Sequence, residues 1–205
     1  DNLNRNNFVL TAGKKINKFT LGGTITFTNQ RTKQANVNAA TSRSDYTLLT
    51  NLLQTASNIP IGEFKNRGLY GWNGYYQNPF WAKDNNRLNE TRNYFNFGTN
   101  AKLEVNKHLE LAYNGSVQLR NNNQISYANA GVSPEEADGG GFNAGSEFFQ
   151  SNYGSTYFYG DFMANFNYEL TDKIGMKFNL GENIQYNNYK RVSQGGSNLD
   201  IEGFY

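Results

Sequence analysis

The 205-residue sequence has no cysteine, one histidine and three prolines. The absence of cysteine excludes disulfides, thiolate metal sites and cysteine nucleophiles. The single histidine, His108, lies in a predicted tight turn, so a Ser/His or Cys/His catalytic pair has no candidate members. We therefore expect no enzyme activity, no catalytic residues, no metal site and no cofactor.

Long hydrophobic runs and a charge imbalance are also missing. No stretch approaches the roughly 18 consecutive apolar residues that a membrane-spanning helix needs. The 19 basic and 17 acidic residues give a net charge of only +2, and they form no basic stripe that could follow a phosphate backbone. A nucleic-acid partner is therefore not expected. The segment beginning at Asp1 also lacks the apolar region of a signal peptide.

Three other features are abundant. Aromatic residues make up 15% of the chain, there are 21 glycines, and about one residue in six is asparagine. The aromatic content argues against disorder, although the apolar fraction of 37% is below the roughly 45–50% of a typical soluble domain. This combination suits a β-barrel that is apolar on its outward face only.

Apolar and polar residues alternate along the chain. Between Phe19 and Thr28, every second residue is apolar or glycine, and most of the residues between are threonine. Such alternation is typical of a strand with two different environments on its two sides. The pattern predicts six strands, at 7–13, 19–28, 94–105, 109–120, 156–170 and 174–189.

The predicted connections alternate in length. Tight turns at 15–18, 106–108 and 171–173 separate the members of each pair of strands, and long loops at 29–93 and 121–155 separate the pairs. Outer-membrane barrels have this asymmetry, with short periplasmic turns and long extracellular loops. A soluble sandwich is the alternative because its strands also alternate, but the long strands and the alternating loop lengths favour a barrel wall.

The predicted fold is therefore all-β. Antiparallel up-and-down strands form part of a large transmembrane β-barrel, and residues 1–205 form one partial barrel domain. Glu182 interrupts the apolar face of the last strand. The apolar faces of the strands are expected to meet lipid. The residues expected to do so include Phe27, Phe95, Phe97, Leu111, Phe162, Phe166 and Phe178.

The first long loop contains a helical pattern and an aromatic cluster. Ser44-Asp45 precedes leucines at helical spacing from Leu48 to Leu53. The aromatic cluster can stack on sugar rings, anchor a protein partner, or pack the loop onto its neighbours. Its members, the candidate ligand- or partner-binding residues, are Tyr70, Trp72, Tyr75, Tyr76, Phe80 and Trp81.

The order of these features resembles the barrel of the SusC-like TonB-dependent outer-membrane transporters of Bacteroidetes. The shared features are the hairpin, the short loop helix, the Ile59-Pro60 step, the Asn78-Pro79-aromatic step and a return strand that opens at Arg92-Asn93-Tyr94. The resemblance covers nearly the whole chain but only part of such a transporter, and the family's plug domain has no counterpart in it. It implies a large barrel with a plugged lumen.

The resemblance also implies partners and a location. Members of the family import oligosaccharides or peptides across the outer membrane of Gram-negative bacteria, with a SusD-like surface lipoprotein as a lid and the TonB complex as energy source. The expected partners are therefore the lid, the TonB complex, outer-membrane lipid and the substrate. Two alternatives are a different outer-membrane barrel, such as a porin or adhesin, and a soluble secreted β-rich glycan-binding module.

Overall fold

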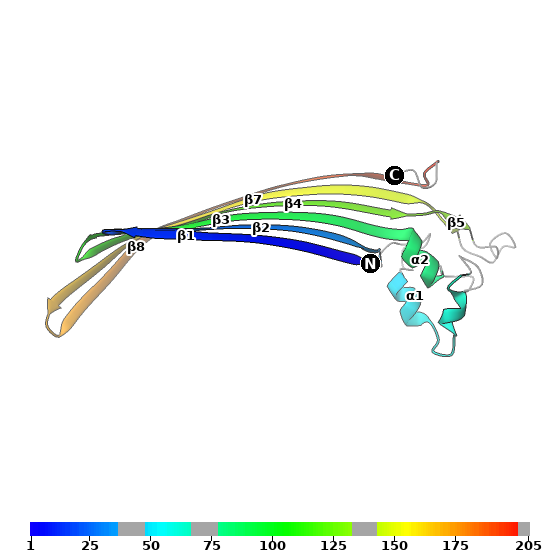
Figure 1. Cartoon of the computed structure of the whole chain (residues 1–205), viewed down its shortest axis with the longest axis horizontal. Coiled ribbons are helices and arrows are strands. Elements are labelled where there is room, and N and C mark those ends of the chain that lie inside the picture. Colours follow the sequence, from blue (N-terminus) through cyan, green and yellow to red (C-terminus); the bar gives the residue numbers. More distant parts are fainter. Residues whose placement is uncertain (37–47, 67–77, 133–142, 201–205) are drawn as a thin grey trace.

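The computed structural model describes residues 1–36, 48–66, 78–132 and 143–200. Six long strands form one antiparallel sheet, in which spatial order follows chain order (Figure 1). This confirms the predicted all-β up-and-down fold. The strands are β1 (Asn2–Ile16), β2 (Phe19–Ala35), β3 (Asn86–Asn106), β4 (Leu109–Ala128), β7 (Glu147–Thr171) and β8 (Ile174–Ser197).

Two-residue turns join the members of each strand pair at one end of the sheet. Asn17 begins the first turn with φ of 52°, in the left-handed region that asparagine tolerates better than most residues. In the second turn, the Asn106 side-chain oxygen accepts hydrogen bonds from the backbone N–H groups of His108 (2.8 Å) and Leu109 (3.0 Å). The turn positions agree with the prediction.

The strands are longer than predicted, chiefly at the loop end. β3 begins at Asn86 rather than 94, β4 continues to Ala128, and β7 begins at Glu147 rather than 156. The connections are correspondingly shorter than the predicted loops 29–93 and 121–155. The reason is that the hydrogen-bond ladder continues through residues that are polar on both faces, such as the paired Asn29, Asn93 and Asn121, where hydropathy no longer alternates.

The register aligns most of the apolar residues of the six strands on one face, which Lys14 and Glu182 interrupt. Phe8 pairs with Phe27 and Phe27 with Phe95, and residues that pair directly point to the same side of a sheet. We call this side the apolar face and the opposite side the polar face. Apolar residues or glycine occupy most positions of the apolar face over about nine residues in β2 (19–27) and about thirteen in β7 (158–170).

The sheet is a single layer within the described residues. Buried apolar side chains there are limited to Ala35, Leu48, Pro79, Ala82 and Ala128, whereas large apolar side chains such as Phe178 (54% exposed) and Leu180 (63%) are uncovered. A sandwich would require a second sheet packed about 10 Å away, and the described strands form none. The apolar face therefore needs a covering that this part of the chain does not supply.

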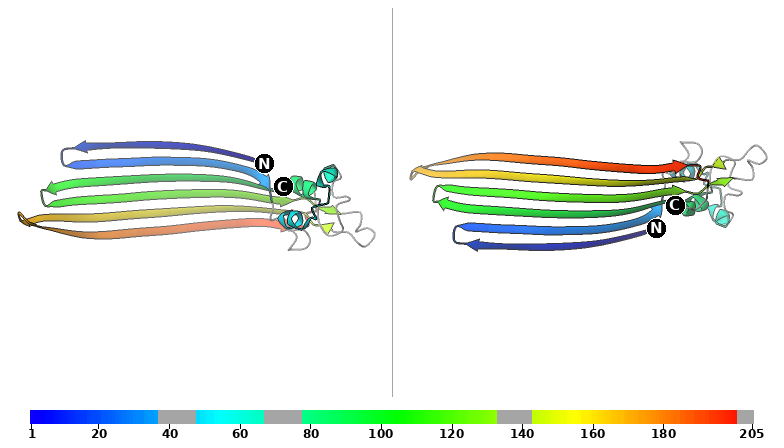
Figure 2. Two further views of the ribbon diagram at one scale, coloured as in Figure 1. Left: turned by 90° about the horizontal axis from the view of Figure 1, so that it is seen from below. Right: turned by 90° about the horizontal axis from the view of Figure 1, so that it is seen from above.

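The three hairpins are staggered along the strands (Figure 2). From the register, the β3–β4 turn lies two or three residues beyond the β1–β2 turn, and the β7–β8 turn four or five residues further. At about 3.4 Å per residue and about 4.8 Å between strands, this stagger over four strand spacings brings the three turns to one level if the strands are inclined by roughly 47–55°. Transmembrane barrel strands are tilted by about 35–45°, so the stagger is close to that of a barrel wall.

Short helices lie at the loop end of the sheet. α1 (Leu48–Gln54) falls within the predicted helical segment; the 3₁₀ helix η1 (Ile61–Phe64) and α2 (Pro79–Asn85) follow. A two-stranded hairpin, β5 (Gly131–Val132) with β6 (Asn143–Ala144), lies in the second connection. Among the described residues, no helix is both long enough and apolar enough to cross a membrane.

Asn78 fixes η1 to the start of α2. It is fully buried (0% exposed); its side-chain oxygen accepts a hydrogen bond from the Phe80 N–H (3.0 Å), and its amide nitrogen donates to the Phe64 carbonyl (2.8 Å). Pro79 follows at the first helical position, where its missing N–H is not needed. The Asn-Pro-aromatic step is therefore a helix start.

We expect Asn78→Ala to destabilise the folded conformation of this loop by about 1–2 kcal/mol, the usual cost of losing an asparagine cap. In the complete protein, trypsin cleavage after Lys65 should become about 5–30 times faster, with no change in sheet stability. Lys83→Ala is the control because Lys83 is exposed and contributes its backbone oxygen, not its side chain, to Arg87. Equal cleavage rates in the two variants would show that the cap does not hold the loop.

Candidate functional surfaces

The polar face has neutralised charges near the turns. Lys15 pairs with Glu104 (3.0 Å) and Lys102 with Glu110 (2.7 Å). Glu110 also accepts a hydrogen bond from the Asn165 amide (3.2 Å). Each of these acids therefore lies beside a cation, and this end of the face has no excess of one charge from these groups.

The loop end of the polar face is richer in arginine. The register aligns Arg5, Arg92 and Arg191 in one row across the sheet, through Gln30, Asn122 and Tyr153. We call these six residues the arginine row. Arg120 lies in the next row toward the turns, and Glu90 in the next row toward the loops.

Only one of these four arginines has an acidic partner among the described residues. Arg92 pairs with Glu90 (2.7 Å), and Glu90 also accepts a hydrogen bond from the Asn122 amide (2.7 Å). Arg120 lies over the Tyr94 ring, 5.4 Å from its centroid, a cation–π contact. Arg191 donates from Nε to the Ser151 hydroxyl (3.0 Å).

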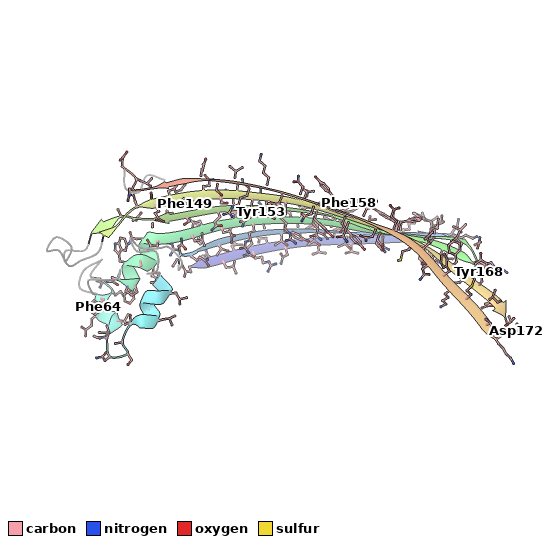
Figure 3. The ribbon with its side chains drawn as sticks, turned by 180° about the vertical axis from the view of Figure 1, so that it is seen from behind. Phe64, Phe149, Tyr153, Phe158, Tyr168 and Asp172 are labelled. Carbon is pink, nitrogen blue, oxygen red and sulfur yellow. The ribbon has the colours of Figure 1, made fainter. Side chains whose placement is uncertain are left out.

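A hollow of about 180 Å³ opens beside Arg191, lined by Asn122, Gln124, Ser151, Tyr153 and Arg191. Its walls come from β4, β7 and β8, and Figure 3 shows Tyr153 toward the loop end of β7. The side-chain oxygen of Asn122 is buried there without a hydrogen-bond partner. Buried polar atoms normally have partners; this oxygen is enclosed by protein atoms, so a group in the hollow can reach it only if the Asn122 side chain turns.

The residues predicted to face lipid lie together on the apolar face. Phe27 pairs with Phe95, and Phe166 pairs with Phe178 at 5.9 Å between ring centroids. Phe97, Leu111 and Phe162 occupy other rows of the same face. The structure thus gathers all seven residues on one surface; their contact with lipid remains a prediction.

The aromatic cluster is only partly within the described residues. Tyr70, Trp72, Tyr75 and Tyr76 lie outside them. Phe80 and Trp81 are half-buried in α2, and Trp81 packs against the small core of Ala35, Leu48 and Ala82. For Trp81, this contact supports the packing alternative.

His108 lies in the predicted turn between β3 and β4 and contacts β7. Its ring stacks on Tyr168, with centroids 4.7 Å apart and planes at 10°, and its Nδ1 lies 2.9 Å from the Asn167 carbonyl oxygen. These contacts tie the β3–β4 turn to β7. Within the described ranges, no three metal-ligating side chains are grouped in a way that could hold an ion.

The arginine row was not predicted from the sequence. Arg5, Arg92 and Arg191 each fall just outside the predicted strands 7–13, 94–105 and 174–189, so they were not assigned to a face. Extending the alternation outward places all three opposite the apolar residues: Arg92, for example, is three residues before Phe95. The alternation therefore places the three arginines on the polar face once the strands are extended to their full length.

No family model and no curated protein matches the sequence. The fold, however, is similar to a solved structure described as the RagAB peptide importer in the "open-open" state. The TM-score is 0.70 at 11% sequence identity, and the match covers 99% of this chain and 22% of the importer chain. The chain thus spans about a fifth of that protein, and at this identity the likeness concerns the fold alone.

Proposed function

We propose that this chain is a segment of the β-barrel wall of an outer-membrane active transporter. The observation that carries the proposal is the uncovered apolar face: six strands in chain order share this face, the apolar stretches of β2 and β7 are about nine and thirteen residues long, and a tilted strand needs about 9–11 to cross the hydrocarbon. The hairpin stagger and the fold similarity to a peptide importer support it.

The two faces then acquire different environments. The apolar face meets outer-membrane lipid, and the polar face lines the lumen. The edge strands β1 and β8 carry unpaired backbone groups on their outer sides, which lipid does not tolerate. Neighbouring strands of a complete barrel cover these edges, so transport belongs to the complete protein and not to this segment.

Following the SusC-like resemblance, the proposed cargo is a peptide or an oligosaccharide, with a SusD-like lipoprotein as the lid and TonB as the energy source. The proposed role is non-enzymatic. The test is uptake of labelled peptides and oligosaccharides by cells of the parent bacterium, with the parent gene intact or deleted and with or without a proton-motive-force uncoupler. Uptake that requires both the gene and the force supports an active transporter; gene-dependent uptake that survives the uncoupler indicates a porin.

The aromatic cluster should serve capture rather than barrel assembly. Replacing Trp72, Tyr75 and Tyr76 together with alanine in the parent protein should leave the heat-modifiable barrel near its normal amount and weaken uptake or lid association. The reason is that large aromatic anchors often dominate binding energy. If lid association is normal but the amount of folded barrel falls, the aromatic cluster packs the loop and does not bind the lid.

A further inference from the structure

We propose that the hollow beside Arg191 binds a carboxylate of the transported ligand. The inference rests on the proposed function, because it assigns substrate chemistry to the lumenal side of the barrel wall. Its first support is the balance of charged residues at the loop end of the polar face. The arginine row and the row on each side of it contain four arginines and one acid, Glu90, which is already paired with Arg92.

The contrast with the turn end of the same face is informative. There Lys15 and Lys102 each have a glutamate within 3.0 Å. Arg191 has no acidic partner among the described residues, although a guanidinium with five donors readily holds a carboxylate through two parallel hydrogen bonds. The loop end therefore has cationic capacity left for an anionic ligand.

Local contacts hold the Arg191 guanidinium at the hollow. Its Nε donates to the Ser151 hydroxyl at 3.0 Å, and Ser151 in turn lies 3.1 Å from the Ser193 hydroxyl. This anchors the planar group through Nε and leaves its terminal nitrogens for a ligand. Tyr153 forms part of the wall, and its ring lies 6.3 Å from that of Tyr189.

The polar wall of the hollow adds a second feature. Gln124 lines the hollow beside Ser151 and Arg191, and its amide oxygen can accept a hydrogen bond. A fitting group therefore has a carboxylate with an N–H or O–H next to it. The C-terminal residue of a peptide satisfies this with its amide N–H, and an acidic sugar satisfies it with a hydroxyl.

The test measures binding to the complete, purified transporter with its lid. The probes are N-acetylated pentapeptides with a C-terminal carboxylate, the same peptides as carboxamides, oligogalacturonides, and the matching neutral galactose oligomers. Wild type should prefer the carboxylate member of at least one pair. Arg191→Gln should lower affinity for that member about tenfold or more, as expected for a charge-assisted hydrogen bond, and leave affinity for the neutral member unchanged.

Arg191→Lys should retain part of the preference, and Lys177→Gln, on the polar face near the β7–β8 turn, should retain all of it. Heat-modifiability verifies that each variant is folded. The peptide and sugar pairs distinguish the two sources of the carboxylate. Binding without preference for the carboxylate, or an equal loss for both members in Arg191→Gln, overturns this inference and leaves the transporter function standing. Failure of every probe to bind wild type overturns this inference, and the uptake experiment then decides the transporter function separately.

Discussion

Phe162→Arg and Leu111→Arg are expected to destabilise the complete barrel by about 2–4 kcal/mol each, the cost of an arginine at the bilayer midplane. Both residues lie well inside the apolar face: Leu111 pairs with Leu103 and Ala164, and Phe162 pairs with Tyr113 and Glu182. Because the Glu182 carboxylate can offset part of the cost at position 162, Leu111→Arg is the decisive variant. An arginine at either site would have to leave the hydrocarbon or draw water into it. The measurement is the denaturant-unfolding midpoint of the complete protein in lipid vesicles, together with its folded yield in outer-membrane fractions.

The matched control is Asn183→Arg. Asn183 pairs with Asp161, the residue before Phe162, and so lies on the polar face at almost the same depth. An arginine there gains a nearby carboxylate and should cost little. If Leu111→Arg and Asn183→Arg behave alike, the two faces do not meet different solvents, and the barrel interpretation fails.

Surface labelling should differ completely between the two ends of the sheet. An epitope tag inserted near residue 140 of the parent protein should be labelled on intact cells, because short turns face the periplasm and long connections face outward in outer-membrane barrels. A tag inserted at Lys107, in the two-residue turn after β3, should be labelled only after the cells are permeabilised.

The labelling comparison is valid only if the two tagged proteins fold with equal yield. The opposite labelling pattern would invert the orientation of the strands while leaving the barrel intact. Labelling of both tags on intact cells would instead place the whole sheet outside the membrane, as expected for a secreted module.

The faces and the turns could be predicted because they depend on local rules. A strand has a period of two, so Phe19 to Phe27 identify one face without any knowledge of neighbours. The turns follow from asparagine and threonine side chains that bond the backbone beside them, as Asn106 and Thr171 do. These signals are contained within a few residues.

The strand ends and the arginine row depend on what lies across the sheet. Asn29 is in a strand because Asn6 and Asn93 pair with it from the strands on either side. Its side-chain amide also donates a hydrogen bond to the side-chain oxygen of Asn93 (2.6 Å). The neighbour of Arg92 across the sheet is set by register, which turn length and a bulge near Asn106 determine. Hydropathy alone does not predict these cross-strand neighbours or the register. The aromatic cluster at 70–76 lies outside the described residues, so its role remains a prediction.

The most direct test of the barrel-wall account is single-cysteine labelling along β7 in the parent protein. This segment contains no cysteine, so each introduced thiol would be its only one, and cysteines elsewhere in the parent would be removed first. Cysteines at 158, 162 and 166 on the apolar face should resist a membrane-impermeant maleimide and react with a lipid-soluble one. Cysteines at 157, 159 and 161 should show the reverse. Equal reactivity of both sets with the impermeant reagent would contradict the account.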